Sequence, residues 1–280
     1  MYSIDLLREQ LPELEETTEK ILVLIDQRDY KQAFKLSTEY KSQILSLKQT
    51  LDDSQKNHAY ILDVFFNMLG SISLVWKEIE SCNYLDSWWK LQDSLDDLRC
   101  LRKFYTLESK TLGFFEDQLQ SIESIYPYEY FSSPGFIVEK YICTICKNDI
   151  ESDDCDHLKG QLYSGEMALA EAKILDIDHF AMVENPMNKR LAIGTDSHPR
   201  FNVFKHIVKS FENKESSPLD FSDVNLIEVK GVKNSSKKLP RNSLCSCGSE
   251  KKYKKCCLLK ETSNHIVIDL KGTSIFSAIC

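Results

Sequence analysis

Apolar residues in the first 130 positions recur at intervals of three and four, with charged and polar residues between them. This period places the apolar side chains on one face of an α-helix. Asp29 and Asp52 stand at breaks in the pattern, where a short acidic side chain is a suitable helix cap. We therefore expect four or five helices packed as a bundle or an elongated hairpin. The apolar runs occupy residues 6–25, 33–51, 61–79, 88–101 and 112–122.

Beyond this helical half the period shortens and turn residues become frequent, which favours strands. Residues 174–183 have the composition of a strand, and Leu191, Ile193 and residues 226–229 are its candidate neighbours. A last strand-like run at residues 266–270 is expected to return and pair with this central sheet. The expected fold class is α+β and predominantly α, with a helical bundle followed by a small antiparallel sheet.

Four cysteines stand near the C-terminus as two pairs separated by eight residues: Cys245, Cys247, Cys256 and Cys257. Four thiolates complete the tetrahedral coordination of one zinc ion. So short a segment cannot bury enough apolar surface to offset its ordering entropy, so a metal is the expected clamp. The lysines between the two pairs favour the deprotonated thiols that zinc requires.

This segment resembles the SEC-C motif, a small zinc module found at the C-terminus of the SecA translocation ATPase and in many otherwise unrelated bacterial proteins. The matching residues are Pro240-Arg241-Asn242, the two cysteine pairs, Gly248-Ser249 and Lys251-Lys252-Tyr253-Lys254. The segment departs from the usual pattern at Ser246 and Glu250, neither of which is a ligand. The resemblance implies a module that docks onto ribosomes or a chaperone and recruits rather than catalyses. The residues expected to contact the partner are Arg241, Lys251, Lys252, Tyr253, Lys254 and Lys255.

A second set of zinc ligands lies in the middle of the chain, where Cys143-x-x-Cys146 is followed after eight residues by Cys155-x-His157. The turn within Cys-x-x-Cys aims both sulfurs at one ion, and the Cys-x-His arm closes the tetrahedron from the other side. We expect two structural zinc ions per chain, with every coordination position filled by protein. The cysteines left without an assignment are Cys82, Cys100 and Cys280.

An enzymatic alternative starts from the same central region. Asp178-His179, Asn188 and His198 follow the Cys-x-x-Cys in an order loosely similar to HNH nucleases, in which histidine activates water beside a catalytic metal. The chain lacks the second Cys-x-x-Cys and the Asn-Leu-containing helix usual in that family, and His179 stands inside an expected strand. The sequence favours a protein without catalytic activity; a metal-dependent nuclease, a toxin, an immunity protein or a phage-defence component are the alternatives.

Charge is distributed unevenly along the chain. The formal net charge is −8, yet residues 230–260 contain ten Lys or Arg against one Glu. The acidic remainder excludes a general nucleic-acid coat, whereas the basic segment has the charge to contact RNA phosphates or an acidic protein surface.

Several features indicate a cytoplasmic protein. The first residues lack the basic start and apolar core of a secretory signal. The most apolar window, residues 60–76, is interrupted by Asp63 and Asn67 and is expected to form a buried helix too short to span a bilayer. Trp88 and Trp89 are adjacent in an expected helix, so either one of them lies at a partner surface or neighbouring helices cover both.

These observations divide the chain into four parts: a helical domain (1–131), a zinc-stabilised α+β module (132–231), a basic SEC-C-like module (232–260) and a C-terminal strand or tail (261–280). The resulting hypothesis is a cytoplasmic adaptor of bacterial type. Its helical half binds a partner or self-associates, and its basic module recruits a ribosomal, nucleic-acid or protein partner.

Overall fold

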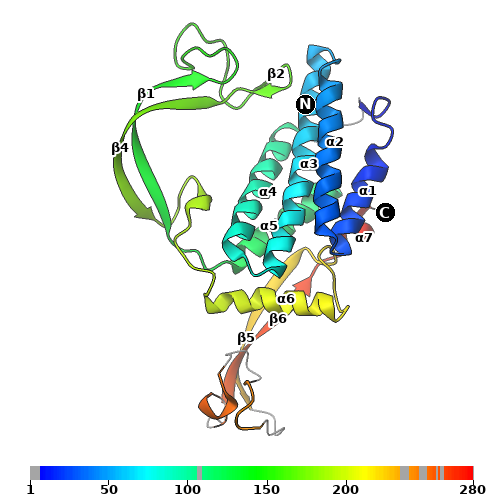
Figure 1. Ribbon diagram of the computed structural model, residues 1–280, viewed down its shortest axis with the longest axis vertical. Coiled ribbons are helices and arrows are strands. Elements are labelled where there is room, and N and C mark those ends of the chain that lie inside the picture. Colours follow the sequence, from blue (N-terminus) through cyan, green and yellow to red (C-terminus); the bar gives the residue numbers. More distant parts are fainter. Residues whose placement is uncertain are drawn as a thin grey trace.

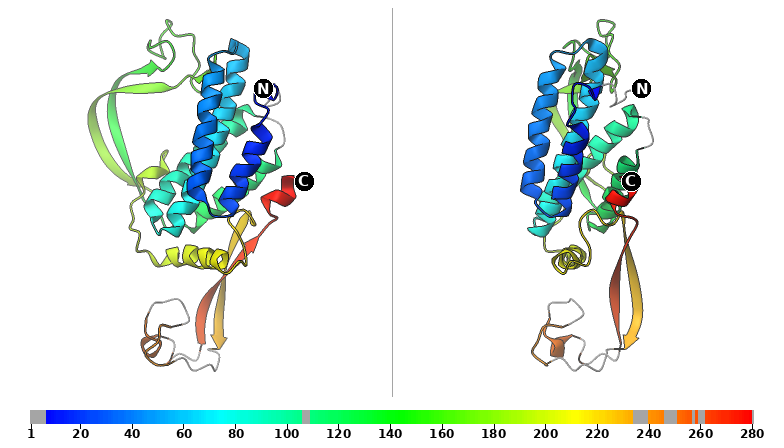
Figure 2. Two further views of the ribbon diagram at one scale, coloured as in Figure 1. Left: turned by 45° about the vertical axis from the view of Figure 1, so that its right-hand side comes forward. Right: turned by 90° about the vertical axis from the view of Figure 1, so that its right-hand side faces the viewer.

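Figure 1 shows a computed structural model of the chain, which describes residues 7–105, 109–233, 240–245, 251–256, 258 and 262–279. Three parts are visible: an upright helical bundle, a curved two-stranded ribbon beside it, and a second two-stranded ribbon that projects beyond one end of the bundle. The rotated views in Figure 2 show that the far end of the second ribbon stands clear of the bundle.

Five helices form the bundle, and the predicted helical half is confirmed. The side chains of Asp29, Asp52 and Ser109 each accept a hydrogen bond from the backbone N–H three residues further on, and so cap α2, α3 and α5. The two breaks expected at Asp29 and Asp52 are therefore real helix starts. The helices are α1 (Leu14–Asp26), α2 (Tyr30–Lys48), α3 (Asp53–Glu80), α4 (Tyr84–Phe104) and α5 (Lys110–Ile125).

The central helix of the bundle is α3, whose inner residues are buried on several sides by its neighbours. Within the part of the chain that the structure describes, α3 is the one helix long and apolar enough to cross a membrane, and 72% of its most apolar window is buried inside the protein. The buried helix expected around residues 60–76 is thus confirmed. It is longer than that window, with 28 residues, because polar residues extend it at both ends.

A further helix, α6 (Asn202–Glu212), lies across one end of the bundle and closes its core (Figure 1). The ring of Tyr84 stacks on Phe201 with 4.1 Å between centroids, and Trp76 meets Phe211 edge-on at 5.5 Å. Buried residues of the bundle, of α6 and of the segment after α6 form one continuous hydrophobic core. The region after the first ribbon therefore packs with the N-terminal helices.

The curved ribbon, called the arch below, consists of β1 (Phe131–Cys143) and β4 (Ala170–Val183), paired antiparallel along their whole length. Register irregularities interrupt the pairing at three places between Gly135 and Lys140. Such bulges bend a strand and increase its twist, which accounts for the curvature in Figure 1. The loop between the two strands contains a small hairpin formed by β2 (Leu162–Tyr163) and β3 (Glu166–Met167).

Two adjacent tryptophans of α4 fasten the base of the arch to the bundle. Trp88 is buried against Tyr126, and its indole N–H donates to the carbonyl of Lys189 at 2.7 Å. Trp89 is 46% exposed, and its indole N–H donates to the carbonyl of Arg190 at 2.9 Å. Both rings thus hold η2 (Lys189–Leu191), the turn that follows the arch. A partner surface at Trp89 stays a prediction.

The second ribbon, called the stalk, pairs β5 (Asp223–Lys233) with β6 (Thr262–Lys271), and α7 (Ile275–Ile279) follows it. Its root is held by Ser121 of α5, whose hydroxyl donates to Asp223 Oδ1 at 2.9 Å and accepts from Val224 N at 2.7 Å. The expectation that residues 226–229 and 266–270 join the central sheet is wrong. These strands pair with each other because β1 already occupies the inner side of β4.

The division into four domains stays a prediction. The helices end at Ile125 and the arch begins at Phe131, close to the first expected boundary. The second expected boundary, at residue 231, falls inside β5, and the pairing of β5 with β6 joins segments on both sides of the basic module.

Replacing Gln118 with Met is expected to lower the free energy of unfolding by about 2 kcal/mol, because buried carbonyl groups lose their donor. The Gln118 side chain is fully buried, and its amide donates to the carbonyls of Pro218 and Phe221 at 2.9 and 2.6 Å. Urea unfolding measures the loss. Gln120→Met, at an exposed position on the same helix, is the matched control and should leave stability unchanged.

The carboxyl of Asp97 makes stability depend on pH. Burial raises its pKa to about 7, although Asn67 Nδ2 donates to it at 2.7 Å. Folding therefore takes up a proton between about pH 4 and 7, and the free energy of unfolding falls as the pH rises through that window. Asp97→Asn should stabilise the protein at pH 8 and change it little at pH 6, as followed by urea unfolding. An equal effect at both pH values would contradict this assignment.

Candidate metal centre

The four predicted central ligands meet at the far end of the arch. One ligand atom from each of Cys143, Cys146, Cys155 and His157 lies within 4.8 Å of the other three. Cys143 is the last residue of β1 and is fully buried, while the other three are partly exposed. The local spacing and the fold therefore bring this predicted set together.

The distances within this cluster fit zinc. Sulfurs bound at 2.3 Å to a tetrahedral zinc ion lie about 3.8 Å from one another. Cys146 Sγ lies 3.5 Å from Cys155 Sγ, and Cys155 Sγ lies 3.9 Å from His157 Nδ1. The sulfurs are too far apart for a disulfide, whose bond is about 2.0 Å long. Three thiols and one imidazole in this geometry form a closed structural site with no position left for substrate.

The electrostatics of the thiols also fit a bound cation. Burial acts against ionisation of Cys143, but contacts from the backbone of Cys146 and Ile145 outweigh it and lower the pKa of its thiol. At Cys155 the backbone of His157 lowers the pKa, yet burial and the neighbouring sulfurs raise it to about 11. One thiolate thus suppresses the ionisation of the next, and a divalent cation removes that conflict.

Hydrogen bonds around the ligands hold the loop in shape. The Cys143 N–H donates to the carbonyl of Asn148 at 2.8 Å, and Lys147, with φ of +63°, turns the chain sharply after Cys146. The His157 ring meets Tyr163 of β2 edge-on, with 4.6 Å between centroids. The hairpin therefore packs directly on a ligand.

The hairpin docks on the bundle, far from the base of the arch. Lys48 Nζ donates to the carbonyl of Gly165 at 2.5 Å, and the Gly165 N–H donates to Asn57 Oδ1 at 2.7 Å. Lys103 Nζ donates to the carbonyl of Gly160. These contacts, called the hairpin dock, join the metal centre to α2, α3 and α4. The arch is thus held at both ends.

Sequence reasoning missed the hairpin dock because its partners lie about a hundred residues apart and carry no motif. The one local signal is Ser164-Gly165, where both residues have positive φ, as a two-residue hairpin turn requires. Leu162 is buried in the core of the bundle beside this turn.

The C-terminal cluster is described only in part. Cys245 is buried and Cys256 is partly exposed, while Cys247 and Cys257 lie outside the described residues. Backbone hydrogen bonds link the two arms: Cys245 N–H to the Lys251 carbonyl at 2.8 Å, and Tyr253 N–H to the Ser243 carbonyl at 2.8 Å. A turn, η4 (Tyr253–Lys255), then leads into Cys256.

The predicted partner-binding residues surround this small structure. Arg241, Lys251, Lys252 and Lys255 are exposed, and Tyr253 and Lys254 are partly exposed. In Figure 1 this module lies at the tip of the stalk, away from the bundle. Its cations are therefore accessible to a large partner.

The residues of the nuclease alternative have local contacts. His179 Nδ1 lies 2.9 Å from Asp178 Oδ2, and the His179 ring lies over Gly135, where an added Cβ would come within 2.5 Å of it. Asn188 caps η2, and His198 caps η3 (Pro199–Phe201), each by accepting a backbone N–H. Among the described residues, the potential metal-ligand cluster contains none of them.

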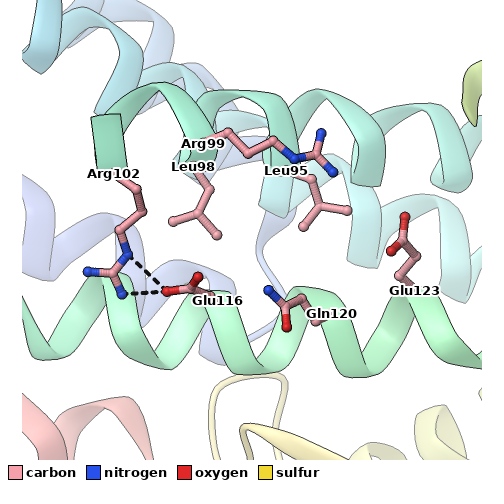
Figure 3. A pocket seen from close by; sticks show the side chains of 7 residues that line it. All are labelled: Leu95, Leu98, Arg99, Arg102, Glu116, Gln120 and Glu123. Atoms are coloured by element: carbon pink, nitrogen blue, oxygen red, sulfur yellow. Dashed lines mark hydrogen bonds and ion pairs between the residues drawn. The ribbon is translucent and has the colours of Figure 1, made fainter. Parts of the chain in front are cut away.

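A pocket of ≈ 450 Å³ opens between α4 and α5, as Figure 3 shows. Arg102 bridges it by an ion pair to Glu116 at 2.6 Å, while Arg99 pairs with Asp96 on its own helix. Glu123, at the other end, accepts from Lys189 at 3.0 Å. Because these charges neutralise one another, the pocket indicates no particular ligand.

Comparison with known proteins identifies one segment. The family model of the SEC-C motif matches residues 241–259, so the segment recognised from its cysteines and lysines is a SEC-C motif. No curated protein and no solved structure matches the chain. The SEC-C match and the central Cys/His cluster together indicate zinc binding.

Replacing Cys146 with Ser is expected to reduce the zinc content from about two ions per chain to about one, because structural zinc sites need all four strong ligands. The loop then loses its clamp, and the hairpin dock should open. Elemental analysis measures the zinc, and hydrogen exchange of peptides covering residues 160–167 measures the dock. A dock that stays protected in this variant would contradict the link between metal and hairpin.

Gly165→Ala serves as the matched variant that opens the dock without touching a ligand. Gly165 has φ of +81°, and an added Cβ would lie 2.8 Å from the carbonyl oxygen of Lys56. We expect faster exchange in residues 160–167 with the zinc content retained. Loss of zinc in this variant would mean that the dock, and not the ligand set, holds the metal.

Proposed function

We propose that this chain is a cytoplasmic adaptor that binds two structural zinc ions and recruits an anionic partner through its basic C-terminal module. The partner is a ribosomal, nucleic-acid or protein surface of negative charge. The observation that carries the proposal is the position of the SEC-C module at the tip of the stalk, with its lysines exposed (Figure 1).

The charge distribution supports recruitment by the module. Residues 230–260 contain ten Lys or Arg against one Glu, in a chain whose formal net charge is −8. Two exposed lysines on each side of Tyr253 form a compact basic surface that attracts phosphates or carboxylates over about 10 Å at physiological salt. The acidic bundle repels the same partner, so contact concentrates at the tip of the stalk.

The closed coordination of the central site supports structural zinc. Three cysteines and one histidine fill its four positions, and catalytic zinc sites keep one position for water or substrate. In the SEC-C module four cysteines would bind the second ion. Thiol ligands of this kind need a reducing compartment, which supports a cytoplasmic location.

Charge reversal in the module tests recruitment. Full-length protein and a variant carrying Lys251→Glu, Lys252→Glu, Lys254→Glu and Lys255→Glu are used as baits in a cell extract, with and without ribonuclease. The variant should lose the partner, with at least about a tenfold drop in recovery, because each lost cation removes an electrostatic contact. Retention of the same partners by the variant would refute the proposal.

Two controls make the result specific. Lys31→Glu, Lys35→Glu, Lys110→Glu and Lys205→Glu place the same charge change on the helices and should leave recovery unchanged. The zinc content of the module variant must equal that of the wild type, since none of the four lysines is a ligand. Loss of the partner after ribonuclease assigns an RNA-containing partner, and its survival assigns an acidic protein.

A further inference from the structure

One face of the arch is an exposed apolar surface. The paired positions Phe136↔Ile177 and Val138↔Ile174 are apolar on both strands, and Phe180 pairs with Pro134. Cross-strand partners lie on the same face of a ribbon. Five of these side chains are between 45% and 70% exposed. The surface, called the apolar stripe, consists of Pro134, Phe136, Val138, Ile174, Ile177, Phe180 and Met182.

The apolar stripe points away from the protein's own core at the base of the arch. There Phe131 and Val183 are paired, and both pack against the hydrophobic core of the bundle. Neighbouring residues of a strand face opposite sides, so Met182, next to Val183, lies on the outer face and is 67% exposed. The bundle therefore does not cover the stripe.

Addition of a partner strand to the arch is disfavoured at both edges. Pro134 in β1 has no N–H to donate, and β1 and β4 together contain three register irregularities. Proline and bulges are the features that protect sheet edges from pairing with another strand. The partner of the stripe therefore binds its face.

The size and charge of the surface also disfavour a second copy of the chain. The stripe has seven side chains, whereas a stable dimer uses roughly 20–30 residues on each side. The arch strands carry four carboxylates, at Glu139, Glu171, Asp176 and Asp178, against two lysines. Two such faces would repel each other.

An amphipathic helix with basic flanks fits the same surface. A two-stranded ribbon with an apolar face becomes stable when a helix packs on it. The stretch from Ile174 to Met182 is about 30 Å long at 3.3 Å per residue, the length of a helix of about 20 residues. Apolar side chains at three- and four-residue intervals would cover the stripe, and lysines or arginines beside them would face Asp176 and Asp178.

We propose that the apolar stripe is a docking site for a basic amphipathic helix of another protein. It lies on the arch, separate from the basic module at the tip of the stalk. The chain then has two partner surfaces of opposite charge, and the zinc centre and the hairpin dock hold the first of them in place.

A model helix tests this site with the full-length protein. The probe is a labelled peptide of about 20 residues, with leucines at three- and four-residue intervals and lysines elsewhere, compared with the same peptide carrying glutamates. Fluorescence anisotropy at physiological salt should show at least about tenfold tighter binding of the lysine peptide. Equal binding of both peptides would overturn the proposed charge preference.

Variants locate the binding site. Phe180→Ser with Ile177→Ser should weaken the lysine peptide about tenfold or more, because both side chains are exposed parts of the stripe. Asp176→Lys with Asp178→Lys should weaken it as well. Met187→Ser, at a fully exposed apolar residue outside the arch, is the control and should bind as the wild type. Unchanged binding by the stripe variant would place the peptide elsewhere and overturn the proposal.

Two further measurements test the other occupants. Light scattering should show a wild-type monomer, and a dimer that dissociates in the Phe180→Ser, Ile177→Ser variant would assign the stripe to a second copy. Flotation with phosphatidylcholine vesicles should show no binding, and binding lost in the same variant would assign a lipid surface. Either result overturns the proposal and leaves the function of the basic module unaffected. Zinc content and thermal unfolding confirm that each variant is folded.

Discussion

A two-stranded ribbon buries little apolar surface and is marginal in water, so both ribbons of this protein depend on what holds their ends. At the base of the arch, Trp88 and Trp89 bind the turn that follows β4. At its far end, the ligand cluster and the hairpin dock return the chain to the bundle. The stalk is held at its root by Ser121, and its tip carries the second cysteine cluster.

The hydrophobic core sets where these ribbons can begin. One core extends from the bundle through α6 to the segment that precedes β5. Trp76 contacts both Phe211 and Phe221, so the root of the stalk rests on the central helix. Zinc and core therefore act at different scales: the core orders the bundle, and metal ligands order loops that are too short to bury a core of their own. This division is typical of interaction proteins that present small modules on a rigid body.

The two arms present different chemistry. The tip of the stalk is basic, while the arch is apolar on one face and acidic at its sides. Both surfaces stand apart from the bundle, so each can reach a large partner without distorting the core (Figure 1). Exposure of Phe180 and Met182 carries a free-energy cost in water that a monomer gains nothing from, which is the physical reason for assigning the stripe to binding.

What the sequence by itself determined is local. Helix period and caps placed the helices and the break at Asp29, and ligand spacing identified both cysteine clusters, because these features depend on neighbours within a few residues. The tertiary structure alone decided which strands pair, which of Trp88 and Trp89 is buried, and where Gly165 meets Lys48. It also decided that residues 174–182, apolar enough for a core strand, stay exposed. These outcomes depend on contacts between residues far apart in the chain, which no local pattern records.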